Sequence, residues 1–450
     1  MREPFLSVVV PTSGRVELFR QTLASLGGQD TRTPWELVVA DDSADPADRA
    51  VIAQAVSDFD HSALTGCRYL FTAPRLGQSA NSNQGLDVAA GAYVRVLHSD
   101  DLLAPWGLTR ECDLARRIGG DAPLMTSMPR RFSERFIPMG DNCTALVQVE
   151  WWIENRLPVG AMLPSTLVFS RRFLDRGIRF DPGYDFCCDW FLTFDLLRAV
   201  LDDGGLVAWN TADWVGYRNH GESVSGRLWR THYAESQKFL HHVLDGGLLR
   251  DRLGWDEGRI RTWARLGFRQ LRQRGIILFL SAPHDDFDGD VETLYGLMAA
   301  DADHAYCPYD ADDWAFWEDM AETLFHPPLR ELGQRLREKV QSMTGFRPAA
   351  GRRVGVSIGV ETFNGAYGKF FHNGQDFVLC LPRSPERWDI SPLGRHVDGA
   401  DEVVVNLMGA GGQQADLLAR VAALVPADKL LSVVCPPADF PALSRQGEYL

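Results

Sequence analysis

The stretch Val94-Arg-Val-Leu-His-Ser-Asp-Asp101 decides how this chain of 450 residues is interpreted. Its alternating apolar residues predict a buried strand, which runs directly into two adjacent carboxylates just after a histidine. Two carboxylates at one strand end would repel each other without a cation, and Mg²⁺ or Mn²⁺ prefers oxygen ligands of this kind. The stretch therefore predicts a metal site at the end of a strand. The alternative is a polar loop that caps a helix starting near Leu103.

The residues before this stretch alternate between strand and helix patterns. Apolar runs predict strands at 5–10, 35–40, 68–71 and 92–97, and helical spacing predicts helices between them at 16–26, 51–59 and 79–90. Such alternation is typical of an α/β fold with a mostly parallel sheet and helices on both faces, in which ligands bind beyond the carboxyl ends of the strands. Polar groups follow three of these strands, at 11–12, 41–42 and 98–101. A nucleotide site is expected there.

Five ordered motifs resemble those of the family-two inverting glycosyltransferases, which have the GT-A fold. They are Ser7-Val-Val-Val-Pro-Thr12, Val39-Ala-Asp-Asp-Ser43, Arg75-Leu-Gly77 with Asn83-Gln-Gly85, Gly91-Ala-Tyr-Val94, and Leu97-His-Ser-Asp-Asp101. The motifs span about the first half of the chain, and five in order are more specific than any one alone. The resemblance implies a Rossmann-like sheet, a nucleotide-diphosphate sugar as donor, with a UDP-sugar favoured, and Mn²⁺ or Mg²⁺ as cofactor.

The resemblance also implies roles for individual residues. The donor would be held by Pro11, Thr12, Arg15, Asp41, Asp42, Arg75, Asn83, His98, Ser99, Asp100 and Arg218. Asp42 would read the base, Asp100 and His220 would bind the metal, and Asp189 would be the catalytic base.

The chain departs from the family pattern at two of these positions. His98 stands where the usual Asp-x-Asp begins, and Cys188 replaces the first acid of the pair that contains the base. The role of His98 stays open among binding the ribose, contacting the metal and packing.

The second half of the first domain is expected to hold the acceptor. Pro164 to Phe169 predicts a strand, and apolar spacing predicts a helix that begins at Asp189. A carboxylate at a helix start is ordinarily a cap or a first-turn acid, and only the resemblance favours a base there. The segment from Pro129 to Gly140 is either a lid over the donor or an ordinary exposed loop.

We expect three parts along the chain. Residues 1–226 would form the GT-A domain, with a donor half at 1–101 and an acceptor half at 102–226; 227–274 would form a helical connector, and 275–450 a smaller Rossmann-like α/β domain. In the last part, strands are predicted at 276–280, 354–360, 377–381, 403–407 and 430–434, and a helix at 415–424. A glycine-rich turn at 409–412 has the geometry of a phosphate-binding turn, although a plain structural turn is favoured.

Composition narrows the function classes. A formal net charge of −14 argues against a nucleic-acid surface. No apolar run reaches the ~20 residues that span a bilayer, and the start lacks a signal-peptide pattern, so a cytoplasmic protein is expected. The eight cysteines have no zinc-binding spacing and are expected to be reduced. If the acceptor is lipid-linked, the enzyme would work at the inner face of the membrane.

The expected function is metal-dependent, inverting transfer of a sugar to a hydroxyl of a saccharide or lipid-linked saccharide, in bacterial surface polysaccharide or glycoconjugate synthesis. Two alternatives stay open. The same carboxylates could serve a nucleotidyltransferase or phosphohydrolase, or the domain could be a non-catalytic scaffold that binds nucleotide sugars.

Overall fold

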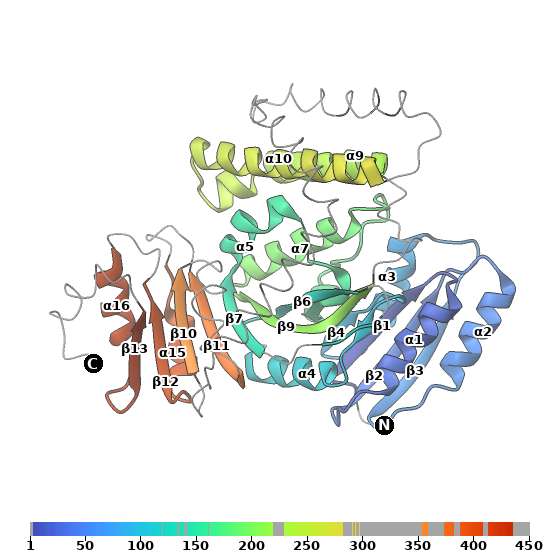
Figure 1. Cartoon of the computed structure of the whole chain (residues 1–450), viewed down its shortest axis with the longest axis horizontal. Coiled ribbons are helices and arrows are strands. Elements are labelled where there is room, and N and C mark those ends of the chain that lie inside the picture. The colour runs from blue at the N-terminus through green and yellow to red at the C-terminus, as the bar shows by residue number, and fades with distance from the viewer. Residues whose placement is uncertain are drawn as a thin grey trace. The chain divides into compact units, whose positions relative to one another are not determined.

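Figure 1 presents the computed structural model of the chain, which describes residues 3–118, 120–132, 135–138, 142–160, 162–218, 229–281, 290, 293, 297, 353–358, 373–381, 388–407 and 413–434. Contacts divide the chain into two compact units, one made of 1–153, 161–220 and 348–450, and the other of 154–160 and 221–347. Within the described ranges, no helix combines the length and the apolar character needed to cross a bilayer.

The first unit is built on one mostly parallel sheet with the strand order β3-β2-β1-β4-β8-β6-β9-β7-β11-β10-β12-β13. Strand β8 runs antiparallel to both of its neighbours, β7 runs antiparallel to β9, and β5 pairs with β9 beside the main path. The N-terminal strands are β1 (Leu6–Thr12), β2 (Trp35–Asp41), β3 (Leu64–Phe71), β4 (Tyr93–Val96), β5 (Leu102–Leu103), β6 (Leu124–Phe132), β7 (Asn142–Gln148), β8 (Leu167–Ser170) and β9 (Leu206–Arg218). The α/β fold predicted from the sequence is confirmed.

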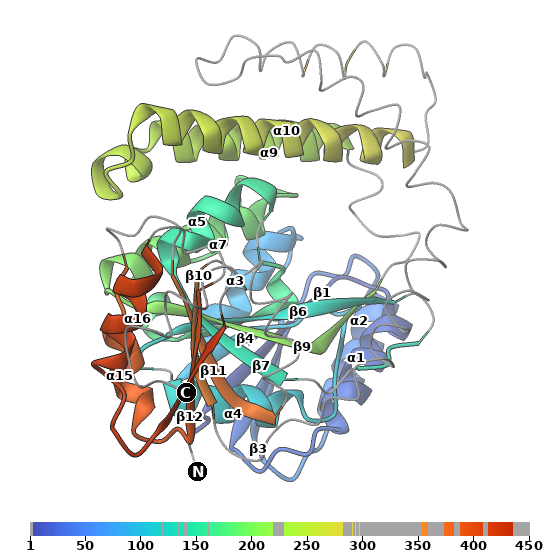
Figure 2. The same cartoon turned by 60° about the vertical axis from the view of Figure 1, so that its left-hand side comes forward.

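Helices cover both faces of the N-terminal strands because β1 is apolar on both sides. Val8 and Val10 belong to the same core cluster as Phe19, whereas Val9 faces the other way, where a Cβ on Gly85 would come within 2.4 Å of it. Figure 2 shows α3 and the α1–α2 pair on opposite sides of β1. The helices of this region are α1 (Val16–Gly27), α2 (Pro46–Ser57), α3 (Gln78–Val88), α4 (Gly107–Ile118), α5 (Val149–Asn155), α6 (Arg172–Asp175) and α7 (Cys188–Asp202).

A buried ion pair lies beneath β4. Arg95 is fully buried, donates to Glu111 of α4, and donates a second hydrogen bond to the backbone oxygen of Ser165. Burial raises the pKa of Glu111 to about 7, while the charge of Arg95 pulls it down. The pair fixes α4 and the segment before β8 to the strand that leads into the predicted metal site.

Removing one member of this pair should strongly destabilise the fold. We expect Arg95→Met to lower the free energy of unfolding by about 3–5 kcal/mol, because it leaves the Glu111 carboxyl buried without its cation. The double variant Arg95→Met/Glu111→Met should recover most of that loss. Urea unfolding measures both, and a single variant within about 1 kcal/mol of the wild type would contradict this role.

The strands of the C-terminal region are also parallel to one another. They are β10 (Arg353–Ile358), β11 (Asn373–Leu381), β12 (Glu402–Asn406) and β13 (Leu430–Val434), with helices α15 (Ser391–Val397) and α16 (Gln414–Ala422). Four of the five predicted strands and the predicted helix are therefore present. Strand β11 pairs with β7, so these strands join the sheet of the N-terminal region. The predicted division at 226 and 274 stays a prediction, and the glycine-rich turn at 409–412 lies outside the described residues.

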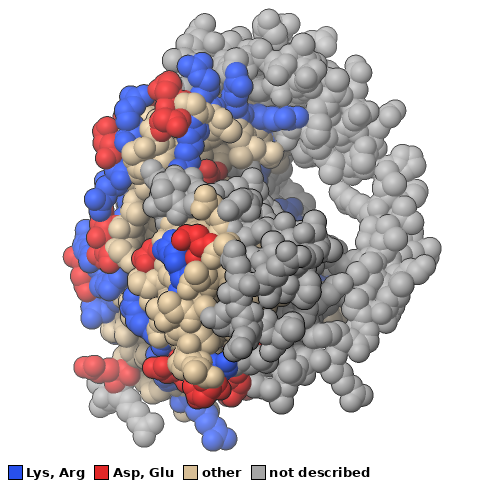
Figure 3. Space-filling view, turned by 90° about the vertical axis from the view of Figure 1, so that its left-hand side faces the viewer, with Lys and Arg blue, Asp and Glu red and all other residues tan. Residues whose placement is uncertain are grey.

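Charged side chains of both signs are interspersed on the face that Figure 3 presents, where the structure describes it. Arg395 and His396 of α15 both contact Asp121, and Arg420 lies 3.8 Å from Asp416 on α16.

The second unit contains a helical pair, α9 (Trp229–Asp245) and α10 (Glu257–Ser281), joined through the π-helix η3 (Leu248–Arg252). Helices occupy much of the region predicted as a connector, whose role as a connector stays a prediction. The strand predicted at 276–280 is wrong because α10 continues through these residues. Gly275 misled the prediction by resembling a strand boundary. A Cβ there would come within 2.5 Å of the Tyr233 ring, so this glycine permits close packing of α9 against α10.

A buried histidine in this helical pair should make the fold sensitive to acid. Burial, together with the charge of Arg274, lowers the pKa of His232 to about 3. Below its ordinary pKa near 6.5 the unfolded chain binds the proton more strongly, so stability falls as the pH drops through this range. Between pH 7 and pH 5 this histidine should account for a loss of about 2 kcal/mol. Urea unfolding at pH 7 and pH 5 measures this loss of unfolding free energy in the wild type and in His232→Phe. The variant should lose less stability than the wild type, and equal losses would contradict the role of His232.

Candidate functional site

Parallel register brings the three predicted polar segments to one edge of the sheet. Thr12 at the end of β1 pairs with Asp41 at the end of β2, and Val9 pairs with Val96 near the end of β4. Residues 11–15, 41–43 and 97–101 therefore leave the sheet side by side. This confirms that the three polar segments gather at the carboxyl edge of the sheet, and the site predicted there stays a prediction.

The first of these segments ends in an arginine with unusual backbone geometry. Arg15 has a φ of 50° at the start of α1, and it is the one non-glycine residue with positive φ in the described part of the chain. Its Nη1 donates to Oδ2 of Asp100 at 2.6 Å. A non-glycine residue in this region is strained, and such strain is often kept at functional sites. Here it accompanies a contact between the first loop and the predicted metal ligand.

The pair Asp100–Asp101 divides into two different environments. Asp101 is buried, and its two oxygens accept hydrogen bonds from the hydroxyl of Ser165 at 2.5 Å and the backbone N–H of Arg218 at 3.0 Å. Burial, followed by the charge of Asp100, raises the pKa of Asp101 to about 7. Asp100 is more exposed and faces Arg15. Asp101 thus fixes the loop, and Asp100 is the carboxylate presented at the sheet edge.

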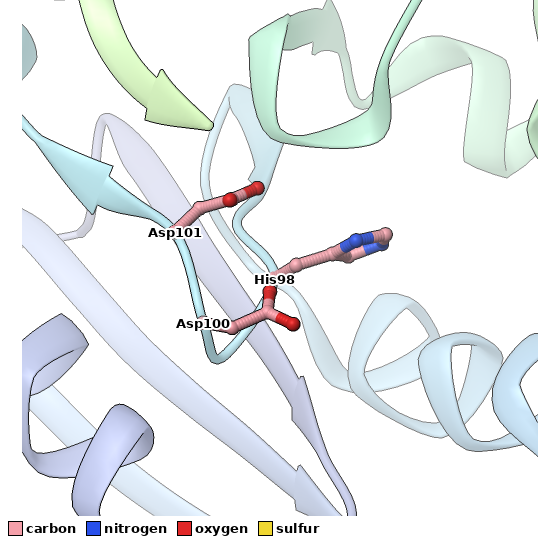
Figure 4. A group of neighbouring side chains, drawn as sticks. All are labelled: His98, Asp100 and Asp101. Atoms are coloured by element: carbon pink, nitrogen blue, oxygen red, sulfur yellow. The ribbon is translucent and has the colours of Figure 1, made fainter. Parts of the chain in front are cut away.

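His98 lies in the same loop. One of its ring nitrogens forms, together with carboxylate oxygens of Asp100 and Asp101, a group that could hold a metal ion. Figure 4 shows the three side chains on the loop after β4, and one ligand atom from each of His98, Asp100 and Asp101 lies within 4.8 Å of the others. The Nε2 atom of His98 is buried with no hydrogen-bond partner among the described residues. Burial lowers the pKa of His98, which favours the neutral imidazole that metals bind. A buried nitrogen beside a carboxylate fits a divalent cation.

Arg218 closes this loop from the end of β9. Its Nε donates to the backbone oxygen of Asp100 at 2.9 Å, and its Nη2 donates to Gln21 of α1 at 2.8 Å. The guanidinium lies 4.6 Å from the centre of the Phe132 ring. Arg218 therefore reaches the predicted site, but its described contacts hold the loop itself. The predicted metal ligand His220 lies outside the described residues, as does Gly140 of the candidate lid.

Asp42 organises the exposed segment that precedes α3. Its two carboxylate oxygens accept hydrogen bonds from the backbone N–H groups of Leu76 and Gly77, at 2.7 and 3.1 Å. Its backbone oxygen accepts a hydrogen bond from Nε of Arg75. The Nη2 atom of the same arginine donates to the Ser13 hydroxyl. Asp42 and Arg75 thus lie together at the carboxyl edge of the sheet, and both carboxylate oxygens of Asp42 are engaged with the loop. Their roles in donor binding stay predictions.

Two other predicted donor contacts are directed into the protein. Asp41 is fully buried, with one oxygen bonded to Ser43 and the other accepting from the Tyr69 hydroxyl at 2.7 Å. Asn83 exchanges two hydrogen bonds with the backbone of Phe180, at 2.8 and 3.0 Å. Both residues therefore support the walls of the site, and their place in the list of donor-binding residues stays a prediction.

The predicted base begins a helix that is tied to α3. Asp189 is in the first turn of α7, and Cys187 precedes the helix. The chain before α7 is held by Ser79, whose hydroxyl donates to the Tyr184 backbone oxygen at 3.0 Å, and by the Asn83–Phe180 pair. The start of α7 therefore lies beside the N-terminal half of α3, whose own start is held by Asp42.

Ser165 is a site residue that the sequence did not reveal. Its hydroxyl donates to Asp101 and accepts from the backbone N–H of His98 at 3.0 Å. A serine before a short strand carries no local signal of this role, because the contact depends on β8 lying antiparallel to β4.

Open α/β sheets of this kind bind ligands beyond the carboxyl ends of their strands, where the carboxylate and imidazole groups of this chain lie. Comparison with protein families finds a match in the N-terminal part of the chain. Residues 7–160 match glycosyl transferase family 2. This match confirms, for the N-terminal part of the chain, the resemblance found in the sequence.

Two curated proteins align with a limited part of the chain. A GalNAc(5)-diNAcBac-PP-undecaprenol beta-1,3-glucosyltransferase of Campylobacter jejuni is 32% identical over 106 residues, which cover 24% of this chain and 33% of that protein. An uncharacterised protein of Mycobacterium tuberculosis is 31% identical over 129 residues, covering 29% and 37%. The chain thus matches about a third of the length of each relative.

Solved structures with similar folds include S. aureus TarS, at 16% identity and a TM-score of 0.43, covering 66% of this chain and 55% of TarS. Another is the mannosyltransferase PcManGT from Pyrobaculum calidifontis in complex with GDP-Man and Mn²⁺. It has 15% identity and a TM-score of 0.43, covering 74% of this chain and 84% of that one.

Proposed function

We propose that this protein is a metal-dependent, inverting glycosyltransferase that moves a sugar from a nucleoside diphosphate to a hydroxyl of a saccharide or lipid-linked saccharide. The observation that carries the proposal is the His98–Asp100 pair at the carboxyl edge of a glycosyl transferase family 2 domain, with Arg15 bonded to Asp100. Such an edge combines a cation site with a guanidinium that can bind phosphate.

The chain's own residues would perform three tasks in the reaction. Asp100 and His220 would hold Mn²⁺ or Mg²⁺, which supplies charge neutralisation for the leaving diphosphate. Arg15 and Arg75, at the entrance of the site, would orient the diphosphate and exclude water. Asp189 would take the proton of the acceptor hydroxyl as its oxygen bonds to the anomeric carbon. The bond from that carbon to the diphosphate oxygen breaks on the opposite side, which inverts the configuration.

The relatives support the donor and acceptor classes of this proposal. The name of the Campylobacter protein contains a lipid-linked substrate. A structure of TarS holds UDP-GlcNAc, and the structure of PcManGT holds GDP-Man. We therefore propose a nucleotide-sugar donor, with a UDP-sugar favoured, and action at the cytoplasmic face of a membrane in surface polysaccharide or glycoconjugate synthesis.

A donor screen without acceptor tests the proposal. Purified protein is incubated with a panel of UDP- and GDP-sugars and Mn²⁺, and the products of slow hydrolysis are identified. Release of free sugar with intact nucleoside diphosphate is expected from one donor. Pyrophosphate or a nucleoside monophosphate would favour a nucleotidyltransferase or phosphohydrolase instead, and tight donor binding without hydrolysis or transfer would favour a scaffold.

A further inference from the structure

We propose that His98 is a nitrogen ligand of the divalent cation in this site and that it makes the site prefer Mn²⁺ over Mg²⁺. The proposal rests on the proposed function and goes beyond it by assigning the ligand set and the ion. It starts from the residue at which this chain departs from the acidic pattern of its family.

The loop presents fewer carboxylate oxygens than its sequence suggests. Asp101 is only 1% exposed, and hydrogen bonds from Ser165 and Arg218 engage both of its oxygens. A cation at Asp101 would have to displace a buried hydroxyl and a buried backbone N–H. Asp100 is therefore the carboxylate of this group that a cation can reach at lower cost.

His98 supplies the remaining ligand of the group. Its backbone N–H is held by the Ser165 hydroxyl, which fixes the start of the side chain within the loop. Its Nε2 atom is buried and has no hydrogen-bond partner in the part of the chain that the structure describes. A buried polar atom of this kind costs free energy unless something binds it, and a metal ion is a natural partner for imidazole.

The resulting donor set discriminates between ions. Mg²⁺ demands oxygen ligands in near-ideal octahedral geometry, whereas imidazole nitrogen suits transition-metal ions. Mn²⁺ shares the preference of Mg²⁺ for carboxylate and phosphate oxygens but, as a first-row transition ion, tolerates an imidazole nitrogen better than Mg²⁺ does, so a mixed set of imidazole, carboxylate and diphosphate favours Mn²⁺ over Mg²⁺. An aspartate at position 98 would return the site to oxygen ligands alone.

Pulsed electron paramagnetic resonance tests the ligand directly. Mn²⁺ is added to the full-length protein together with UDP, and in a second sample with GDP. We expect a nitrogen coupling to Mn²⁺ in the wild type, a change of that coupling when the protein carries ¹⁵N-labelled histidine, and its loss in His98→Asp. His242→Asp, which changes an exposed histidine of α9, should retain the coupling and serves as the matched control.

Binding of the two ions provides a second readout. Calorimetry with Mn²⁺ and with Mg²⁺, each in the presence of UDP or GDP, gives the ratio of the two dissociation constants. We expect His98→Asp to reduce the ratio of Mg²⁺ to Mn²⁺ dissociation constants by at least about tenfold. Loss of a residue that only supports a metal ligand already costs about tenfold in metal affinity, and loss of a direct ligand should cost no less. Circular dichroism and thermal unfolding verify that the variant is folded, and His98→Asn provides a second variant without an added charge.

The outcomes separate this inference from the proposed function. Mn²⁺ binding without nitrogen coupling, or coupling that persists in His98→Asp, would overturn the inference while leaving sugar transfer intact. Nitrogen coupling that depends on His98, in a protein that turns over no donor with either ion, would support the inference and overturn the proposed function.

Discussion

Replacing Asp189 by asparagine should reduce sugar transfer by about 10²- to 10⁴-fold, the usual contribution of a general base. The amide keeps the shape of the carboxyl group but cannot accept the acceptor proton. Because Asp189 begins α7 and the proposed metal ligands lie on the loop after β4, the variant should retain donor binding. Transfer is measured with the true acceptor, and donor binding by calorimetry.

A matched control lies on the same helix. Asp195→Asn changes an acid of α7 that is 45% exposed and pairs with Arg198 three residues later, so it should leave transfer within about twofold, as expected for an exposed pair of this kind. If Asp189→Asn retained wild-type transfer, Asp189 would be an ordinary first-turn acid that interacts with the helix dipole, and the base would have to be sought elsewhere.

Replacing Asp100 by asparagine should reduce transfer by about 10²- to 10³-fold, since loss of several kcal/mol of charge stabilisation has that effect on a rate. The variant should bind Mn²⁺ more weakly, and excess Mn²⁺ should restore part of the rate. Calorimetry and initial rates over a range of Mn²⁺ concentrations measure both effects.

The fold should survive this change. The Arg15–Asp100 pair is partly exposed, and exposed ion pairs are worth about 0–1 kcal/mol, so the unfolding midpoint should move little. Asp113→Asn, on the exposed side of α4, is the matched control and should change neither metal binding nor rate. Unchanged Mn²⁺ affinity in Asp100→Asn would remove Asp100 from the metal site.

Much of the donor half could be predicted because its signals are local. Strands β1 and β2 are mostly apolar and β4 alternates apolar residues with Arg95, and the polar residues that follow these strands meet at one edge by the rule of parallel sheets. The run at 276–280 was misassigned because a short apolar segment fits a strand or a buried helix equally well. The presence of glycine at position 275 is explained by its close approach to the Tyr233 ring of α9. A single sequence does not reveal such a contact.

The individual roles at the site depended on longer-range contacts. Asp41 and Asp42 are adjacent in the sequence, yet one is held by Tyr69 and Ser43 inside the sheet and the other by the segment before α3. Likewise, Ser165 joins His98 to Asp101 from a distant part of the chain. Motifs identify which residues gather at an edge, but side-chain partners decide which of them can meet a ligand.

The hydrogen bonds of Asp42 have a consequence for how the protein could diversify. Both carboxylate oxygens accept from main-chain amides of Leu76 and Gly77, so this anchoring depends little on which side chain stands at position 76, whereas the φ of 81° at Gly77 favours glycine there. These residues are exposed, while the strands beneath them are buried. Substitutions at the exposed positions before Gly77 should therefore cost the scaffold little stability, which makes this loop a natural target for engineering of the proposed donor site.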